Sequence, residues 1–216
     1  MATVRVALKE ALRALRAVAP GDDPTADELS AGLEAAQALI LDIHEARGPL
    51  HEIDVSGAYT AGENQRLRIE SGDTVSITLP NSVSLFWQYD PYDYGFAPGY
   101  PGVPPQGSTG AADNIEWRSP RDGARIEIVG TAQALYFYRA DINAWQPATG
   151  LTIDGELPFN NRLTDAFAAM LAERLIDEVT TASGPTPALT RRIARARAAM
   201  FSQAGRHHTR RIGAYF

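Results

Sequence analysis

The spacing of apolar residues changes twice along this 216-residue chain, and no other feature of the sequence constrains the fold as strongly. Over residues 3–48, apolar side chains recur every three or four positions, which is typical of amphipathic helices. From about Ile53 the spacing becomes two, as in half-buried strands, and helical spacing returns at Leu163. We therefore predict an α+β protein in which a β segment is inserted into a helical domain.

Local start and stop signals mark four expected helices. The start signals are Thr3, the T-x-x-E capping box of Thr25 and Glu28, the Asn160-Asn161 pair, and Thr186-Pro187. Proline and glycine pairs close the first two helices at residues 20–21 and 48–49, and the fourth helix ends near Gly205. Each helix pair alone would expose an apolar stripe, so we expect the N-terminal and C-terminal pairs to pack together as a small bundle.

The inserted segment is expected to be an antiparallel β module built from two hairpins. The first joins residues 66–70 to 75–79, and the second joins 124–129 to 134–139, with Trp145 in a possible third strand. Residues 87–120 between them are predicted to form one long irregular stretch rich in Pro, Gly and Tyr. The expected domains are a helical hairpin (1–50), the β module (51–155), a second helix pair (156–205) and an extended basic tail (206–216).

Charge is divided unequally along the chain. Residues 184–216 contain seven arginines and no acidic residue, so they carry +7, and subtracting this from the net −6 leaves −13 for residues 1–183. A basic arm on an acidic body suggests an anionic partner, either nucleic acid or an acidic protein surface, and a solvated arm is the alternative. Arg191 and Arg195, with Arg192 beside them, are expected to form a basic stripe on one helix. No motif for reading a nucleic-acid sequence is present.

The sequence holds no recognised catalytic, cofactor or metal signature. The absence of cysteine excludes disulfides and thiolate metal sites, and neither an H-E-x-x-H motif nor a Walker loop nor a G-x-S-x-G elbow occurs. Residues 1–18 lack the apolar core of a signal peptide, and no apolar run reaches the roughly 18 residues of a membrane span. We therefore expect a protein that is not an enzyme and that needs no cofactor or metal.

Aromatic residues gather in the segment between the two expected hairpins. The candidate interface residues there are Trp87, Tyr89, Tyr92, Tyr94, Phe96 and Tyr100. Tyrosine and tryptophan supply large contact areas at low entropic cost, which favours an interaction loop. Because Asp90 and Asp93 lie among these rings, a glycan-binding or cell-wall-degrading role is a second interpretation. Packing of the loop on its own β module is a third.

Four stretches of the chain resemble the head-to-tail adaptor proteins of tailed phages and phage-like particles, including the tail-accessory gatekeepers. They are Ala11-Leu12-Arg13-Ala14-Leu15, Pro24-Thr25-Ala26-Asp27-Glu28-Leu29, the helix from Asn160-Asn161-Arg162-Leu163 to Leu175, and the helix from Pro187 to Phe201 with its basic tail. Together they cover about half of the chain. The β insert matches less well, because many members of that family have a shorter loop there.

The resemblance implies a structural virion protein made in the host cytoplasm and located at the portal vertex. Such adaptors form a dodecameric ring beneath the portal, extend the channel for DNA packaging and ejection, and hold tail or stopper proteins. The partners it implies are the portal, neighbouring copies, those tail proteins and DNA passing through the channel. The basic stripe would face the channel or a neighbour, and the aromatic loop would meet tail proteins. Portal binding is assigned to Arg206, Arg210, Arg211, Ile212, Tyr215 and Phe216, which combine guanidinium groups with apolar anchors.

Overall fold

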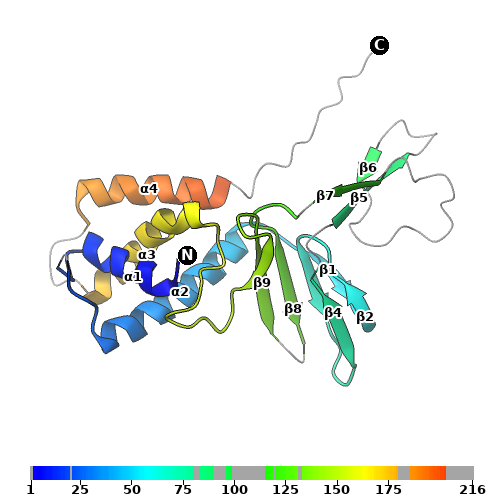
Figure 1. Cartoon of the computed structure of the whole chain (residues 1–216), viewed down its shortest axis with the longest axis horizontal. Helices are drawn as coiled ribbons and strands as arrows, with labels where there is room; N and C mark the ends of the chain where they lie inside the picture. Colours follow the sequence, from blue (N-terminus) through cyan, green and yellow to red (C-terminus); the bar gives the residue numbers. More distant parts are fainter. Residues whose placement is uncertain are drawn as a thin grey trace, which may run out of the picture. The chain divides into compact units, whose positions relative to one another are not determined.

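The computed structural model divides the protein into two compact units. Its described backbone covers residues 2–19, 21–79, 83–89, 96–98, 115–118, 120–130, 133–179 and 185–202, and side chains are described over 2–19, 21–79, 120–130, 133–176 and 185–201. The helical unit is built from residues 2–49 together with the chain from Arg162 onward, and the β unit from residues 50–161 (Figure 1). The predicted α+β class is confirmed. Each unit is described below by itself.

Within the described residues the helical unit has four α-helices, and the caps predicted at Thr3, at Thr25 with Glu28 and at Thr186 are present, whereas the Asn160-Asn161 pair leads into a 3-10 turn. The helices are α1 (Val4–Ala14), α2 (Ala26–Ala46), α3 (Thr164–Val179) and α4 (Pro187–Ser202), and the short 3-10 turn (Asn161–Leu163) precedes α3. The Thr3 side chain accepts a hydrogen bond from the Val6 backbone N–H at 3.4 Å. The capping box is reciprocal, because the Glu28 N–H donates to Thr25 Oγ1 at 3.3 Å and the Thr25 N–H donates to Glu28 Oε2 at 2.7 Å.

The first helix ends earlier than the Pro20-Gly21 signal predicted. Arg16 adopts a left-handed conformation, with φ of 61°, and its N–H donates to the Arg13 carbonyl at 3.0 Å. The next N–H, that of Ala17, donates to the Leu12 carbonyl at 3.0 Å. These two hydrogen bonds form a Schellman motif, which satisfies the last carbonyls of the helix. Glycine usually occupies the left-handed position of this motif, so an arginine there gave no stop signal in the sequence.

Helix α3 is the centre of the helical unit, since α1, α2 and α4 all pack against it (Figure 1). Among the apolar side chains of this core that are at most 6% exposed are Leu8, Leu12, Ile40, Ile43, Phe167, Leu171, Leu175, Leu189, Ile193 and Met200. Helix α2 approaches α1 closely at Gly32, where an added Cβ would lie 2.2 Å from Leu8 Cδ1. The four amphipathic faces predicted from the sequence therefore share one apolar core.

The described residues of the β unit form ten short strands in three sheets. They are β1 (His51–Asp54), β2 (Gly57–Thr60), β3 (Gln65–Arg68), β4 (Val75–Thr78), β5 (Val83–Tyr89), β6 (Phe96–Pro98), β7 (Ile115–Arg118), β8 (Arg125–Val129), β9 (Ala134–Arg139) and β10 (Ala144–Pro147). The strand orders are β1-β3-β8-β9-β10, β2-β4 and β6-β5-β7. The second expected hairpin is confirmed: β8 and β9 pair antiparallel, and β10 adds the third strand with Trp145 opposite Tyr138.

The first expected hairpin is wrong, and the largest sheet is therefore mixed instead of antiparallel. Strand β3 pairs in parallel with β1 and β8, and β4 pairs in parallel with β2 in a different sheet. The turn at Ser71 and Gly72 carries the chain from one sheet to the other instead of folding β4 back on β3. Residues 51–60 run alongside 65–78 and supply the parallel partners, and the Val55 N–H extends this pairing to the Arg68 carbonyl at 2.9 Å.

The segment expected to be irregular between residues 87 and 120 contains regular pairing. Strand β5 pairs antiparallel with β6 and with β7, and its C-terminal residues Trp87 and Tyr89 fall within the segment. Proline and glycine predict an irregular loop here, yet Pro98 belongs to β6, an edge strand of its sheet, where proline is tolerated.

A small apolar cluster joins the β1-β3-β8-β9-β10 sheet to the β2-β4 sheet. Val55, Ala61, Leu67 and Ile126 are at most 5% exposed, and Trp145 is among the half-buried residues packed on them. Close backbone approach is needed at Gly130, which has φ of 126° and where an added Cβ would lie 2.1 Å from the Ile69 carbonyl oxygen. Glycine alone fits this position without strain, because it lacks a Cβ and tolerates positive φ.

Candidate interaction surface on helix α4

Helix α4 carries arginines around an apolar stripe that holds it to the bundle. Leu189, Ile193, Ala196 and Met200 are at most 6% exposed, and α4 packs against α3. The helix begins at a capped turn, because the Leu189 N–H donates to Thr186 Oγ1 at 3.3 Å. Since the buried positions recur every three or four residues, the remaining positions are left on the solvent side. All four arginines of the helix lie at these exposed positions.

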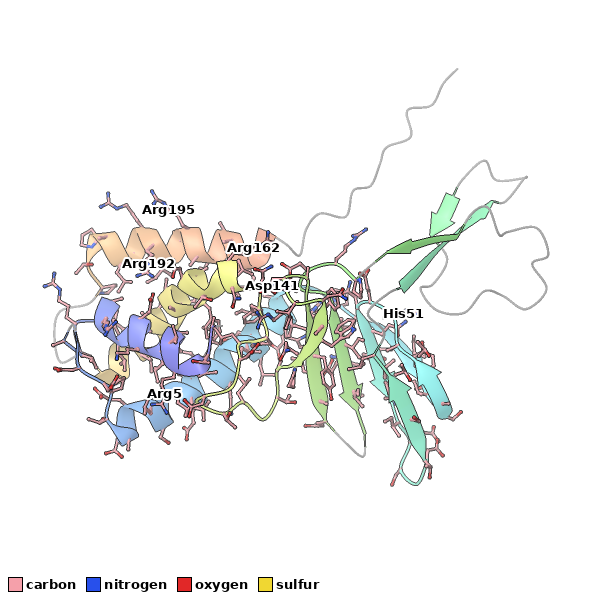
Figure 2. All side chains as sticks on the ribbon, viewed as in Figure 1. Arg5, His51, Asp141, Arg162, Arg192 and Arg195 are labelled. Carbon is pink, nitrogen blue, oxygen red and sulfur yellow. The ribbon has the colours of Figure 1, made fainter. Side chains whose placement is uncertain are left out.

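Two of the four arginines pair with carboxylates of the same unit. Arg197 Nη2 lies 2.9 Å from Glu173 Oε1 on α3. Arg192 Nη2 lies 3.8 Å from Glu10 Oε2 on α1, and both side chains are about two-fifths exposed. Figure 2 shows Arg192 on the side of α4 that is nearer to α1. Exposed ion pairs of this kind contribute about 0 to 1 kcal/mol, so they position α4 more than they stabilise it. Arg192 is therefore turned partly towards its own bundle.

The other two arginines, Arg191 and Arg195, form the outward face of α4. They are exposed, lie one helical turn apart, and form no ion pair with any side chain that the structure describes. Figure 2 shows Arg195 directed away from the bundle. Other exposed residues near them are Ala188, Thr190, Ala194 and Ala198. This outward face of α4 is thus smooth and basic, and it can bind an anionic surface without first breaking an internal ion pair.

Among the described residues of the β unit, the most deeply buried charged side chain is that of Arg139, which no sequence motif indicated. Its side chain is 0% exposed, with Nη2 2.8 Å from Asp141 Oδ2 and Nη1 2.9 Å from Glu156 Oε2. Nη1 also donates to the Leu157 carbonyl at 3.3 Å. These interactions raise the pKa of Arg139, and the hydrogen bond from Arg139 holds the pKa of Asp141 below its ordinary value.

The Arg139 network is closed and structural. Asp141 Oδ2 accepts a further hydrogen bond from the Asn161 N–H at 3.3 Å, so the network ties the end of β9 to the segment that leads out of the β unit. One signal could have revealed it: Arg139 follows Leu135 and Phe137 at a spacing of two, and both of these are buried. An arginine on the inward face of a strand needs hydrogen-bond acceptors inside the fold, because a buried charge without partners is costly.

Most of the other predicted site residues lie outside the described part of the chain. All six portal-binding candidates, from Arg206 to Phe216, and the loop residues Tyr92, Tyr94 and Tyr100 lie there. For Trp87, Tyr89 and Phe96 the structure describes the backbone alone, and it places Tyr89 directly opposite Phe96 between β5 and β6. At least one aromatic pair of the expected loop is therefore brought to the same point of a sheet.

The described residues hold neither a candidate metal site nor a helix that could span a membrane. Among them, no group of three or more histidine and carboxylate side chains could hold a metal ion. No helix within the same ranges is both long enough and apolar enough to cross a membrane. Comparison with known proteins found no matching family model and no matching curated protein.

Proposed function

We propose that this chain is a structural virion protein, a head-to-tail adaptor that forms a ring under the portal, extends the DNA channel and offers a platform for tail attachment. The observation that carries the proposal is the outward face of α4, where Arg191 and Arg195 are exposed and form no ion pair with described residues. An assembly protein uses such a face because a partner can pair with its arginines without breaking an ion pair inside the subunit.

The layout of the helical unit supports the same role. Residues 2–49 and the chain from Arg162 onward meet around α3, so the unit that would form the ring is held together by both ends of the described chain. The β unit leaves this bundle as an insertion between α2 and α3. In the family that the sequence resembles, the bundle forms the ring and the C-terminal segment reaches the portal. The proposed partners are the portal, neighbouring copies, tail or stopper proteins, and DNA that passes non-specifically through the channel.

The proposed role involves no catalysis. The protein would act at the portal vertex of the virion after synthesis in the host cytoplasm. Its portal contact would be the segment after α4, in which Arg206, Arg210 and Arg211 accompany Ile212, Tyr215 and Phe216. Arginine and aromatic side chains are the types that contribute most at protein interfaces, and arginine binds carboxylates through two parallel hydrogen bonds.

The decisive experiment is to locate the chain in purified particles by electron microscopy with a tag or an antibody. We expect density at the portal vertex in a ring of copies. Particles that lack the protein would exclude the adaptor function. A glycan-binding or cell-wall-degrading role would instead place it at the tail tip or in solution with measurable activity on peptidoglycan.

A deletion of residues 206–216 tests the portal contact. We expect the truncated chain to keep the circular dichroism of the full chain and to lose capture of the portal, because the described core ends before this segment. Replacing Tyr215 and Phe216 by alanine should weaken capture strongly if the partner is protein. If the partner is DNA, affinity should instead fall with salt at a slope near −0.9 per neutralised phosphate, and the aromatic residues should matter little.

The aromatic loop is tested by replacing both Asp90 and Asp93 with asparagine. We expect assembly to continue and no peptidoglycan hydrolysis to be measured in either the parent or the variant. Hydrolysis by the parent that disappears in the variant would support the alternative function, since paired carboxylates perform the acid and base steps in glycosidases.

A further inference from the structure

Two helices of the helical unit carry charges of opposite sign. Helix α2 contains five carboxylates and neither lysine nor arginine, whereas α4 contains four arginines and no acidic residue. A single helix with one sign of charge is ordinary. Two oppositely charged helices in the same unit favour association between copies. The acidic α2 of one copy is complementary in charge to the basic α4 of a neighbour.

Pairing within the unit neutralises only part of these charges. On α2, Glu28 is used in the capping box and Asp42 pairs with Arg174 of α3. The remaining α2 carboxylates, Asp27, Glu34 and Glu45, are exposed and form no ion pair with the residues that the structure describes. Their negative charges are complementary to the positive charges of Arg191 and Arg195, which likewise form no ion pair with described residues.

An exposed leucine, Leu41, lies among the carboxylates of α2. Leu41 is 47% exposed, one of two large apolar side chains with high exposure among the described residues. Positions 34, 38, 41 and 45 share one face of a helix, so Glu34 and Glu45 flank Leu41 along the axis. We name Glu34, Leu41 and Glu45 the acidic face. On α4, the small side chains of Ala188, Ala194 and Ala198 lie between and beside the arginines and leave room for an apolar contact.

We propose that the outward face of α4 in one copy binds the acidic face of α2 in the next copy. The inference rests on the proposed ring and specifies the surfaces that build it. Arg191 and Arg195 pair with Glu34 and Glu45, while Leu41 packs on the alanines. Because the two faces are different, the contact is heterologous: each copy uses α4 towards one neighbour and α2 towards the other. Such a contact generates a closed ring when its rotation closes.

Charge and surface chemistry favour a second copy over DNA as the occupant of the α4 face. The chain carries a net charge of −6, so duplex DNA would be repelled by most of the molecule. Phosphates also offer nothing apolar to the alanines of α4, whereas α2 offers Leu41 between two carboxylates. Charged groups around a small apolar contact are the usual composition of a protein interface and set its register.

Charge reversal on each face tests this contact in the full-length protein. Sedimentation velocity at low salt and rising concentration should show self-association of the parent chain. We expect R191E/R195E and E34R/E45R each to weaken association by about tenfold or more, because like charges then oppose each other. The combined variant, with all four charges reversed, should associate again. R68E/R121E reverses two exposed arginines of the β unit and serves as a charge-matched control that keeps parental association.

Three outcomes would overturn the contact. One is a parent chain that stays monomeric at every concentration, and a second is a combined variant that stays as weak as its components. A third is DNA binding by the parent that R191E/R195E removes while association is unchanged, which would assign the stripe to the channel. All three readouts come from folded protein, which circular dichroism of each variant verifies.

Carbodiimide cross-linking locates the contact at the level of residues. Lys9 is the chain's one lysine, and it pairs with Asp23, so the parent supplies an internal control for the reagent. The variant R195K adds an amine on the outward face of α4. In a mixture of copies with light and heavy nitrogen, we expect mixed-mass peptides that join position 195 to Glu34 or Glu45. Formation of the Lys9–Asp23 link without any mixed-mass link from position 195 would contradict the contact.

Cross-linking of R195K particles separates this inference from the proposed function. If the chain is at the portal vertex and α4 is not linked to α2 of a neighbour, the surfaces proposed here are wrong and the adaptor role stands. If the chain is absent from particles but free copies give the mixed-mass link, the contact is correct and the adaptor role fails.

Discussion

The helical unit and the β unit are stabilised in different ways, and the difference shows where each can accept change. In the helical unit, four apolar helix faces meet and most charged side chains lie at the surface, several of them in ion pairs within the unit. The β unit has a smaller apolar cluster and relies on buried polar groups, among them Arg139 at 0% and Gln65 at 1% exposure. We expect charge changes to alter assembly when made on the helical unit and to alter stability when made inside the β unit.

The sequence itself provides separate probes for the two units. All three tryptophans, at positions 87, 117 and 145, belong to the β unit, and α1 to α4 belong to the helical unit. Tryptophan fluorescence therefore follows the β unit during denaturation, while circular dichroism at the helix band follows the helical unit. Each prediction below is measured with both probes, because a two-unit chain need not unfold in one step.

The largest effect is expected for Arg139→Met, which keeps the long apolar stem and removes the charge. Asp141 and Glu156 would lose their buried partner, and removal of one member of a buried pair costs about 3 to 5 kcal/mol. Because both carboxylates are partly exposed, we expect a loss of about 3 kcal/mol in the fluorescence transition and little change in circular dichroism. Arg66→Met is the control, since Arg66 pairs with Glu127 at the surface of the sheet and should cost at most about 1 kcal/mol.

The next effect is expected for Gly130→Ala in the β unit. The new Cβ would meet the Ile69 carbonyl oxygen, which is part of the backbone and cannot rotate away, and the φ of 126° is strained for alanine. We expect the fluorescence transition to lose about 2 to 3 kcal/mol. An alanine at Gly72, where φ is also positive but nothing lies within 4 Å, isolates the conformational cost from the clash. Equal losses in both variants would show that the close approach at Ile69 is unimportant.

A smaller effect is expected for Gly32→Ala in the helical unit. The new Cβ would clash with the end of the Leu8 side chain, which can change rotamer, and alanine gains about 1 kcal/mol of helix propensity over glycine. We expect a net loss of about 1 kcal/mol in the circular dichroism transition. Combination with Leu8→Val should cost less than the sum of the single changes, because the smaller side chain makes room. Simple additivity would argue against the contact.

The smallest effect is expected for the stability of the β unit at low pH, through the Asp141 carboxylate. Since Arg139 lowers the pKa of Asp141 in the folded state, the unfolded chain binds more protons at this group. Its contribution is complete above the unfolded value near 4 and is lost as pH falls through the lower folded value. Fluorescence-detected stability should therefore decline below about pH 4, and Asp141→Asn should make that decline shallower. A decline of unchanged slope in the variant would assign it to other carboxylates.

The helical unit could be predicted almost completely from the sequence, because the signals that set it are local. Thr3, Thr25 and Glu28 form the caps that their spacing indicated, and the apolar periods point to the observed core. The exception is the end of α1, where Arg16 takes the position that glycine usually occupies. The basic stripe was also placed correctly on one helix, although Arg192 turns partly towards Glu10.

The β unit could be predicted only in part, because strand pairing depends on residues far apart in the sequence. The β8–β9 hairpin has a short turn and was identified, whereas β3 pairs with β8 some sixty residues later, as in Gln65 opposite Ile126. An alternating pattern shows which side chains face inward but not which strand lies beside them. The Arg139 network could not be predicted for the same reason, because Glu156 lies in a segment that has no regular spacing of apolar residues.

The insertion of residues 50–161 between α2 and α3 also sets an order of events during synthesis. At about 5 to 20 residues per second, roughly ten to thirty seconds pass between the synthesis of α1 and that of α3, and the β unit is synthesised during this time. The apolar residues Val4, Leu8 and Leu12 of α1 lack the cover of α3 during this time, although α2 is already available to pack against α1. A nascent chain that has not yet reached α4 can present the α2 face but not the α4 face. On the proposed contact, a truncated chain would therefore cap one side of a growing assembly and never extend it.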